Sequence, residues 1–75
     1  MLLNELDENT KAVITSINAG RELKSRLYSF GLTKGKEFKV KRYSLNKNVV
    51  EIEVDRSLVG LRRGESEKIE VEIIS

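Results

Sequence analysis

The chain has no cysteine, no histidine and no proline among its 75 residues. Without cysteine and histidine there is no disulfide, no thiolate zinc site and no imidazole metal ligand. A serine nucleophile would have no histidine base, and neither a GxxxxGK[ST] loop nor a GxGxxG motif occurs. These absences predict a protein that is not an enzyme, with no catalytic residues, no metal ligands and no cofactor.

Long hydrophobic runs are also missing. No apolar stretch approaches the roughly 20 residues that cross a bilayer, and the opening MLLNELDEN lacks the basic start and apolar core of a signal peptide. A chain of this length makes one small domain with a thin core. We therefore expect a single domain over residues 1–75 that begins at its own Met1 and is cytoplasmic.

The net charge of +2 conceals a gradient along the chain. Residues 1–19 carry a net −2, residues 20–47 carry nine basic and two acidic residues for a net +7, and residues 48–75 carry a net −3. One interpretation is an electrostatic face for an anionic partner. The alternative, which we favour, is that basic and acidic strands lie side by side and neutralise each other.

The hydrophobic pattern predicts a mainly β fold. Alternating or β-branched segments indicate four or five short strands, the last with Ile69, Val71 and Ile73 on one face. So few strands bury a core only by curling, which favours a small antiparallel barrel over an open sheet. The strands are expected at residues 10–17, 36–44, 49–55, 57–63 and 68–74, with a turn or single 3₁₀ turn at 63–67.

One short helix, about Gly20 to Phe30, is expected after the first strand, because Leu23, Leu27 and Phe30 recur at helical spacing. We assign these three side chains to the core. Gly31 is placed to end the helix in a left-handed conformation.

The segment GLTKGKEFKV then turns the chain from the helix into a strand. If Gly31 closes a Schellman cap, Leu32 packs on Leu27. Gly35 would supply a second positive φ in the turn that follows.

Two kinds of charged cluster could carry chemistry. The acid pairs Glu51/Glu53 and Glu70/Glu72 could hold a hard cation weakly, but their alternation favours solvated strand faces. A basic run beside aromatic residues could bind single-stranded nucleic acid, although a solvated face is again the favoured interpretation. That run comprises Lys34, Lys36, Lys39, Lys41 and Arg42, with Phe38 and Tyr43 close by.

Leu58, Val59 and Leu61 around Gly60 allow two interpretations. They could form an exposed apolar patch for a partner. Closure of the core is the favoured alternative.

Three segments together resemble the FeoA family: LNEL at the start, AVITSINAGRELKSRLYSFGLTKGKEFKV in the middle and LVGLRRGESEKIEV near the end. The resemblance covers nearly the whole chain, and its most specific part is the leucine-containing helix that runs into GLTKGKEFKV. It implies an SH3-like barrel with an inserted helix. It also implies an accessory or regulatory role in ferrous-iron uptake, by contact with the cytosolic part of FeoB, a membrane transporter that hydrolyses GTP.

Two loops depart from the family pattern. LNKN stands where a Gly-Asp-Pro-like turn is frequent, and Asp55 with Arg56 occupies a corner where glycine is common. The same barrel occurs in some iron-dependent repressors, but no helix-turn-helix precedes it here. The family also allows transition-metal-ion association, for which this chain offers no soft ligand.

The resulting hypothesis is a partner-binding protein that reaches the membrane only through FeoB-like contact and binds no nucleic acid. Self-association through an exposed strand edge is compatible with it. The predicted partner-binding residues are Lys34, Lys36, Lys39, Leu58, Val59, Leu61, Arg62 and Arg63.

Overall fold

The computed structural model describes residues 1–75 in full. It contains five strands and two helices, and a 3₁₀ turn, η1 (Leu3–Glu5), that the sequence pattern did not predict. Instead of the expected turn, residues 63–66 form one α-helical turn. The elements are β1 (Lys11–Ile17), α1 (Arg21–Ser29), β2 (Glu37–Tyr43), β3 (Val49–Val54), β4 (Ser57–Arg62), α2 (Arg63–Ser66) and β5 (Ile69–Ile73).

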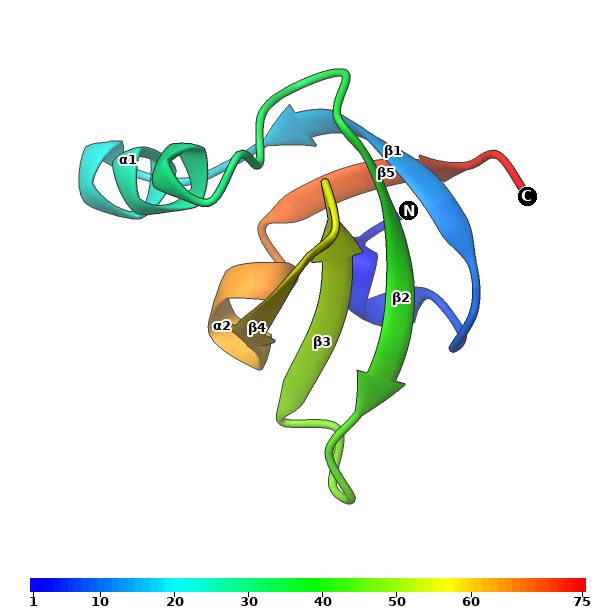
Figure 1. Ribbon diagram of the computed structural model, residues 1–75. Coiled ribbons are helices and arrows are strands. Elements are labelled where there is room, and N and C mark those ends of the chain that lie inside the picture. The colour runs from blue at the N-terminus through cyan, green and yellow to red at the C-terminus, as the bar shows by residue number, and fades with distance from the viewer.

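The five strands form one antiparallel sheet in the order β4-β3-β2-β1-β5. The sheet curls strongly around its core (Figure 1). Its hydrogen-bonded ladder stays open between β4 and β5, where η1 contacts β5 and α2, and α2 contacts β4. The prediction of a mainly β, SH3-like fold with five strands and an inserted helix is confirmed.

Alternation along the strands builds the core. Phe38 and Val40 of β2 and Val50, Ile52 and Val54 of β3 are all less than 5% exposed. They belong to a single cluster of 16 buried apolar residues. The inward positions predicted for β2 and β3 are confirmed.

Two residues that we assigned inward are exposed instead. Phe30 is 40% exposed because it is the C-cap of α1, beyond the last turn, where its ring lies 5.7 Å from the Arg26 guanidinium carbon. Ile73 is 54% exposed because it ends an edge strand and no element packs beyond it. Leu23 is partly buried against the core, and only Leu27 of the predicted helical stripe is fully buried.

The end of α1 has the predicted Schellman geometry. Gly31 has a φ of +83°, its N–H donates to the Tyr28 carbonyl at 2.9 Å, and the Leu32 N–H donates to the Leu27 carbonyl at 3.0 Å. Leu27 and Leu32 are both fully buried in the core cluster. The cap therefore satisfies two helix-end carbonyls and returns the chain to the core.

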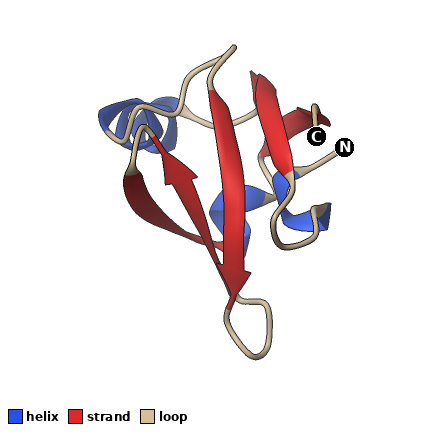
Figure 2. Ribbon diagram, turned by 45° about the vertical axis from the view of Figure 1, so that its right-hand side comes forward, coloured by secondary structure: helices blue, strands red, loops and turns tan.

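Gly35 makes the second predicted turn. Its φ is +90°, and the Lys36 N–H donates across the turn to the Thr33 carbonyl at 3.0 Å. The Gly35 N–H also donates to the Ile14 carbonyl at 2.7 Å, which fixes the turn against β1. Figure 2 shows this loop crossing the end of the sheet before β2 begins.

We expect Gly31→Ala to destabilise the fold by about 1–2 kcal/mol, because an L side chain resists a left-handed backbone. A new Cβ would meet only Asp55 Oδ2, at 3.9 Å, so the cost is conformational rather than steric. Urea unfolding measures the change. Gly64→Ala, in α2 with negative φ and open space, is the matched control and should be close to neutral; equal losses for both variants would contradict the cap.

Candidate partner-binding surface

The central basic segment lies beside an acidic strand. Arg42 of β2 forms an ion pair with Glu51 of β3, with Nε and Oε1 2.9 Å apart, and Lys39 is the direct cross-strand partner of Glu53. The favoured interpretation, that basic and acidic strands neutralise each other, is confirmed for Arg42 and Glu51. Lys39 and Lys41 of the same basic strand form no ion pair.

The predicted lysines lie at the junction between α1 and β2. Lys34 is exposed and has no ion-pair partner, whereas Lys36 pairs with Asp55 in the turn between β3 and β4. Lys39 lies on the outer face of β2, directly after the buried Phe38. The Lys36–Asp55 pair therefore joins the lysine segment to the start of β4.

The sheet register adds a second connection between the two halves of the predicted surface. Glu53 lies between Lys39 on one side and Leu58 on the other, so the three side chains form one row across the outer face. Leu58 is 55% exposed. We call Lys34, Lys36, Lys39 and Leu58 the junction surface.

Val59 and Leu61 do not belong to any surface. They are 8% and 0% exposed and pack in the core, because strand alternation points them inward while Leu58 and Arg62 face outward. Because they are buried they form no exposed patch, and the alternative of core closure is confirmed for these two residues but not for Leu58. Arg62 and Arg63 are exposed where β4 passes into α2.

Helix α1 is attached to the barrel by few contacts, and Figure 1 shows it standing off the end of the sheet. Besides Leu27, its main tie is an ion pair between Arg26 and Glu65 of α2. The Glu65 side chain is 12% exposed and also accepts the Arg62 backbone N–H, at 2.9 Å. Glu65 therefore caps the N-terminus of α2 and also connects α2 to α1.

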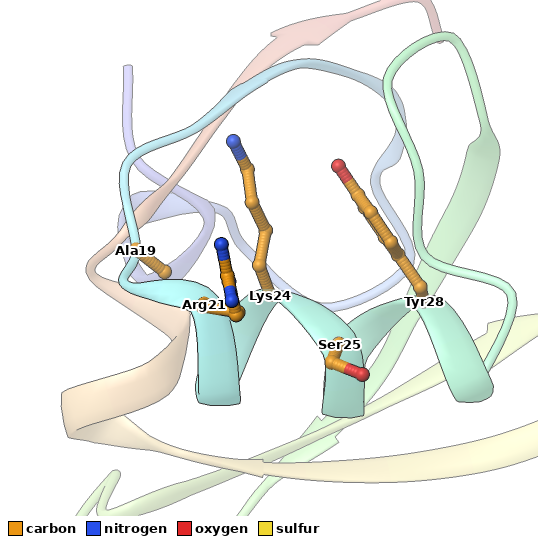
Figure 3. A pocket seen from close by; sticks show the side chains of 5 residues that line it. All are labelled: Ala19, Arg21, Lys24, Ser25 and Tyr28. Atoms are coloured by element: carbon orange, nitrogen blue, oxygen red, sulfur yellow. The ribbon is translucent and has the colours of Figure 1, made fainter.

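The structure also shows a hollow that sequence reasoning missed. It has a volume of ≈ 390 Å³ and is lined mainly by α1, with the Lys24 and Tyr28 side chains extended toward the same side (Figure 3). A second hollow of ≈ 180 Å³ shares Lys24 and Tyr28 and reaches Lys34. The first hollow is lined by Ala19, Arg21, Lys24, Ser25 and Tyr28.

The spacing of residues along α1 could have indicated this hollow. Arg21, Lys24 and Tyr28 recur at i, i+3 and i+7, which makes a second stripe beside the apolar one. Neither Arg21 nor Lys24 takes part in an ion pair. These residues extend the positive charge of the junction surface along α1.

The acidic residues do not form a metal site. No three acidic side chains come together in a group that could hold a metal ion. Glu51 is paired with Arg42, and Glu53 lies opposite Lys39. The side chains present therefore do not fit a resident transition-metal ion.

Tyr43, at the other end of β2, has a raised pKa. Tyr43 donates its phenol proton to the Leu6 carbonyl. Burial raises the pKa of Tyr43 above its ordinary value of 10.0, and the carboxylates of Asp7 and Glu8 raise it further. This tyrosine ties η1 to the sheet through its neutral form.

Comparison with known proteins places the chain in a family. The model of the FeoA domain matches residues 1–73, and the chain belongs to the FeoA family. A curated Campylobacter jejuni protein named "Putative Fe(2+) transport protein A" is 46% identical over 74 residues, which cover 99% of this chain and all of that protein.

Solved structures show the same fold. The solution structure of the FeoA protein from Chlorobium tepidum is 33% identical with a TM-score of 0.93, over all of this chain and 71% of that one. The apo form of the manganese-activated repressor ScaR, 24% identical, matches 99% of this chain with 35% of its own length and a TM-score of 0.89. The similarity to ScaR shows the fold alone. Neither helix of the present chain has the length and apolar composition needed to span a membrane.

Glu65→Ala should lower the free energy of unfolding by about 1–3 kcal/mol, because it removes the acceptor of a charged donor and of the Arg62 N–H. Arg26→Ala should cost less than about 1 kcal/mol, because the arginine side chain is half-exposed and water screens the pair. Urea unfolding of both variants checks the order. A larger loss for Arg26→Ala would show that the ion pair, rather than the α2 cap, is the important contact.

Stability should fall with rising pH above about pH 10 through Tyr43. The folded state holds the phenol proton more tightly than the unfolded state, because the folded pKa is raised. This contribution is fully present below the ordinary pKa and is lost as pH rises through the folded pKa. Urea unfolding at a series of alkaline pH values should show a steeper decline for the wild type than for Tyr43→Phe. Identical profiles for wild type and Tyr43→Phe would refute the assignment.

Proposed function

We propose that this protein is a non-enzymatic accessory protein of ferrous-iron uptake that binds the cytosolic part of a FeoB-like membrane GTPase transporter. The observation that carries the proposal is membership of the FeoA family over nearly the whole chain, together with 46% identity to a protein named for Fe(2+) transport. The protein acts in the cytoplasm, as one domain, and meets the membrane only through its partner.

The junction surface is the proposed contact. Lys34 is exposed and unpaired, Lys39 is only partly buried, and Leu58 adds exposed apolar area beside them. Arg21 and Lys24 continue the same positive charge along α1. A complementary partner presents acidic groups around a small apolar patch, and charge of this kind mainly steers association.

The structure favours protein contact over the nucleic-acid alternative. Binding of single strands depends on exposed aromatic rings in a basic groove. Phe38 is 4% exposed in the core, and the Tyr43 hydroxyl is held by the Leu6 carbonyl. Of the two rings beside the basic run of β2, Phe38 is therefore unavailable for stacking, and Tyr43 is tied to η1 through its hydroxyl.

Lys34→Glu should weaken binding to the purified cytosolic part of the transporter about fivefold, an effect that should shrink at high salt. Lys47→Glu is the matched control, because it makes the same charge change on an exposed lysine beyond the opposite end of β2. Titration calorimetry at low and high salt measures both. Unchanged affinity after charge reversal of Lys34, Lys36 and Lys39 together would rule out the junction surface as the contact. If the wild type does not bind, the proposed function is wrong.

A further inference from the structure

The two edges of the sheet differ in whether their outer backbone groups are paired. The outer edge of β5 is paired with the first residues of the chain: the Val71 N–H donates to the Met1 carbonyl at 2.8 Å, and Leu2 bridges to Glu70. Strand β4 is the opposite edge and pairs in the sheet only with β3, while α2, which follows it, contacts it. One edge is therefore paired along its outer side and the other is not.

The register identifies the backbone groups that the β4 edge presents. Val59 and Leu61 pair with Ile52 and Val50, and the Arg63 N–H donates to the Asn48 carbonyl at 2.8 Å. Because these odd-numbered positions face β3, the backbone groups of the intervening positions point away from it. Those positions are Leu58, Gly60 and Arg62.

Two of the three outward positions remain free. The Arg62 N–H is taken by Glu65 at 2.9 Å, but no bond outside the sheet ladder involves Leu58 or Gly60. Gly60 is exposed, and since it has no side chain this exposure is that of its backbone. An unpaired strand edge of this kind is a template for another strand.

We propose that the β4 edge, from Leu58 to Arg62, binds an extended acidic segment of a partner protein as an added strand. Main-chain hydrogen bonds to Leu58 and Gly60 would supply affinity, and side chains would supply specificity. The inference gives the binding mode for one part of the contact proposed above and in that sense rests on it.

The charge around the edge selects an acidic segment. Arg56, Arg62 and Arg63 are exposed and have no ion-pair partner. The acids closest in sequence, Asp55 and Glu65, are already paired with Lys36 and Arg26. The edge therefore presents three free guanidinium groups, which form strong bidentate bonds with carboxylates.

The same charges disfavour a second copy of this chain. Two antiparallel β4 strands would use both free positions if Leu58 of one copy bonded to Gly60 of the other. That register places Arg56 directly opposite Arg62 twice, and like charges in direct cross-strand contact are destabilising. An acidic partner meets no such repulsion.

The test uses two capped ten-residue peptides, one alternating glutamate with valine and the other alternating lysine with valine. Amide hydrogen exchange followed by NMR reports the backbone directly. We expect the glutamate peptide to slow exchange at Leu58 and Gly60 at least about tenfold at saturation, and the lysine peptide to leave both amides unchanged. Binding without protection of these amides, no binding of the glutamate peptide, or protection that rises with protein concentration alone would each overturn the proposal.

Gly60→Pro removes one edge donor without touching the ladder to β3, which edge strands tolerate. It should weaken glutamate-peptide binding about tenfold, while Gly60→Ala, which keeps the N–H and meets only Val49 Cγ1 at 3.8 Å, should bind like the wild type. Should Gly60→Pro fail to fold, Arg62→Glu with Arg63→Glu gives the same test through charge and should abolish the preference for the glutamate peptide. Equal binding by every folded variant would overturn the proposal.

The outcome is separable from that of the proposed function. If the transporter's cytosolic part binds wild type and Gly60→Pro equally, the added-strand mode is wrong and the proposed function stands. If the glutamate peptide protects the edge but the transporter does not bind the wild type, the edge site stands and the proposed function fails.

Discussion

The left-handed backbone at Gly31 is the constraint on which the placement of the proposed contact surface depends. It allows the chain to leave α1 and return at once, so that Leu27 and Leu32 enter the same core. Leu27 is the only residue of α1 that is fully buried. Because so little of the helix is buried, the cap determines both the position of α1 and the point where the lysine segment begins.

The ion pairs contribute more to the relative positions of the elements than to the stability of the fold. Arg26–Glu65, Lys36–Asp55 and Arg42–Glu51 each join two different elements. Pairs with a half-exposed member contribute little to the free energy of folding. They neutralise acids beside α1 and β4, however, and so determine which cations stay free. The surface charge of the protein is thus a consequence of its internal pairing.

Much of the fold was predictable from local pattern. The alternation in β2 and β3, the helix from about Gly20 and the positive φ at Gly31 all follow from residue type and spacing. These features depend on neighbours in sequence, which is why one chain suffices to predict them. The number of strands favoured a small curled barrel, and the family resemblance indicated that it is SH3-like.

Two of the errors concern positions where an element ends. Phe30 and Ile73 continue the apolar period of their elements, yet the packing partner stops before they do. Periodicity cannot show where the opposing surface ends. The same limit explains why the hollow beside Lys24 and Tyr28 was missed, because it depends on how α1 stands relative to β1 and the Lys34 loop.

The turn between β3 and β4 brings the two proposed contacts together. Asp55 and Arg56 have φ values of +50° and +70°, as both central residues of a two-residue type I′ hairpin require. In this strained position Asp55 holds Lys36 of the junction surface, and Arg56 flanks the free β4 edge. Glycine at either position would relieve the strain there but would remove the charge of that residue. The departure from the family's usual glycine therefore gives a charged corner that lies between the two proposed contacts and connects them.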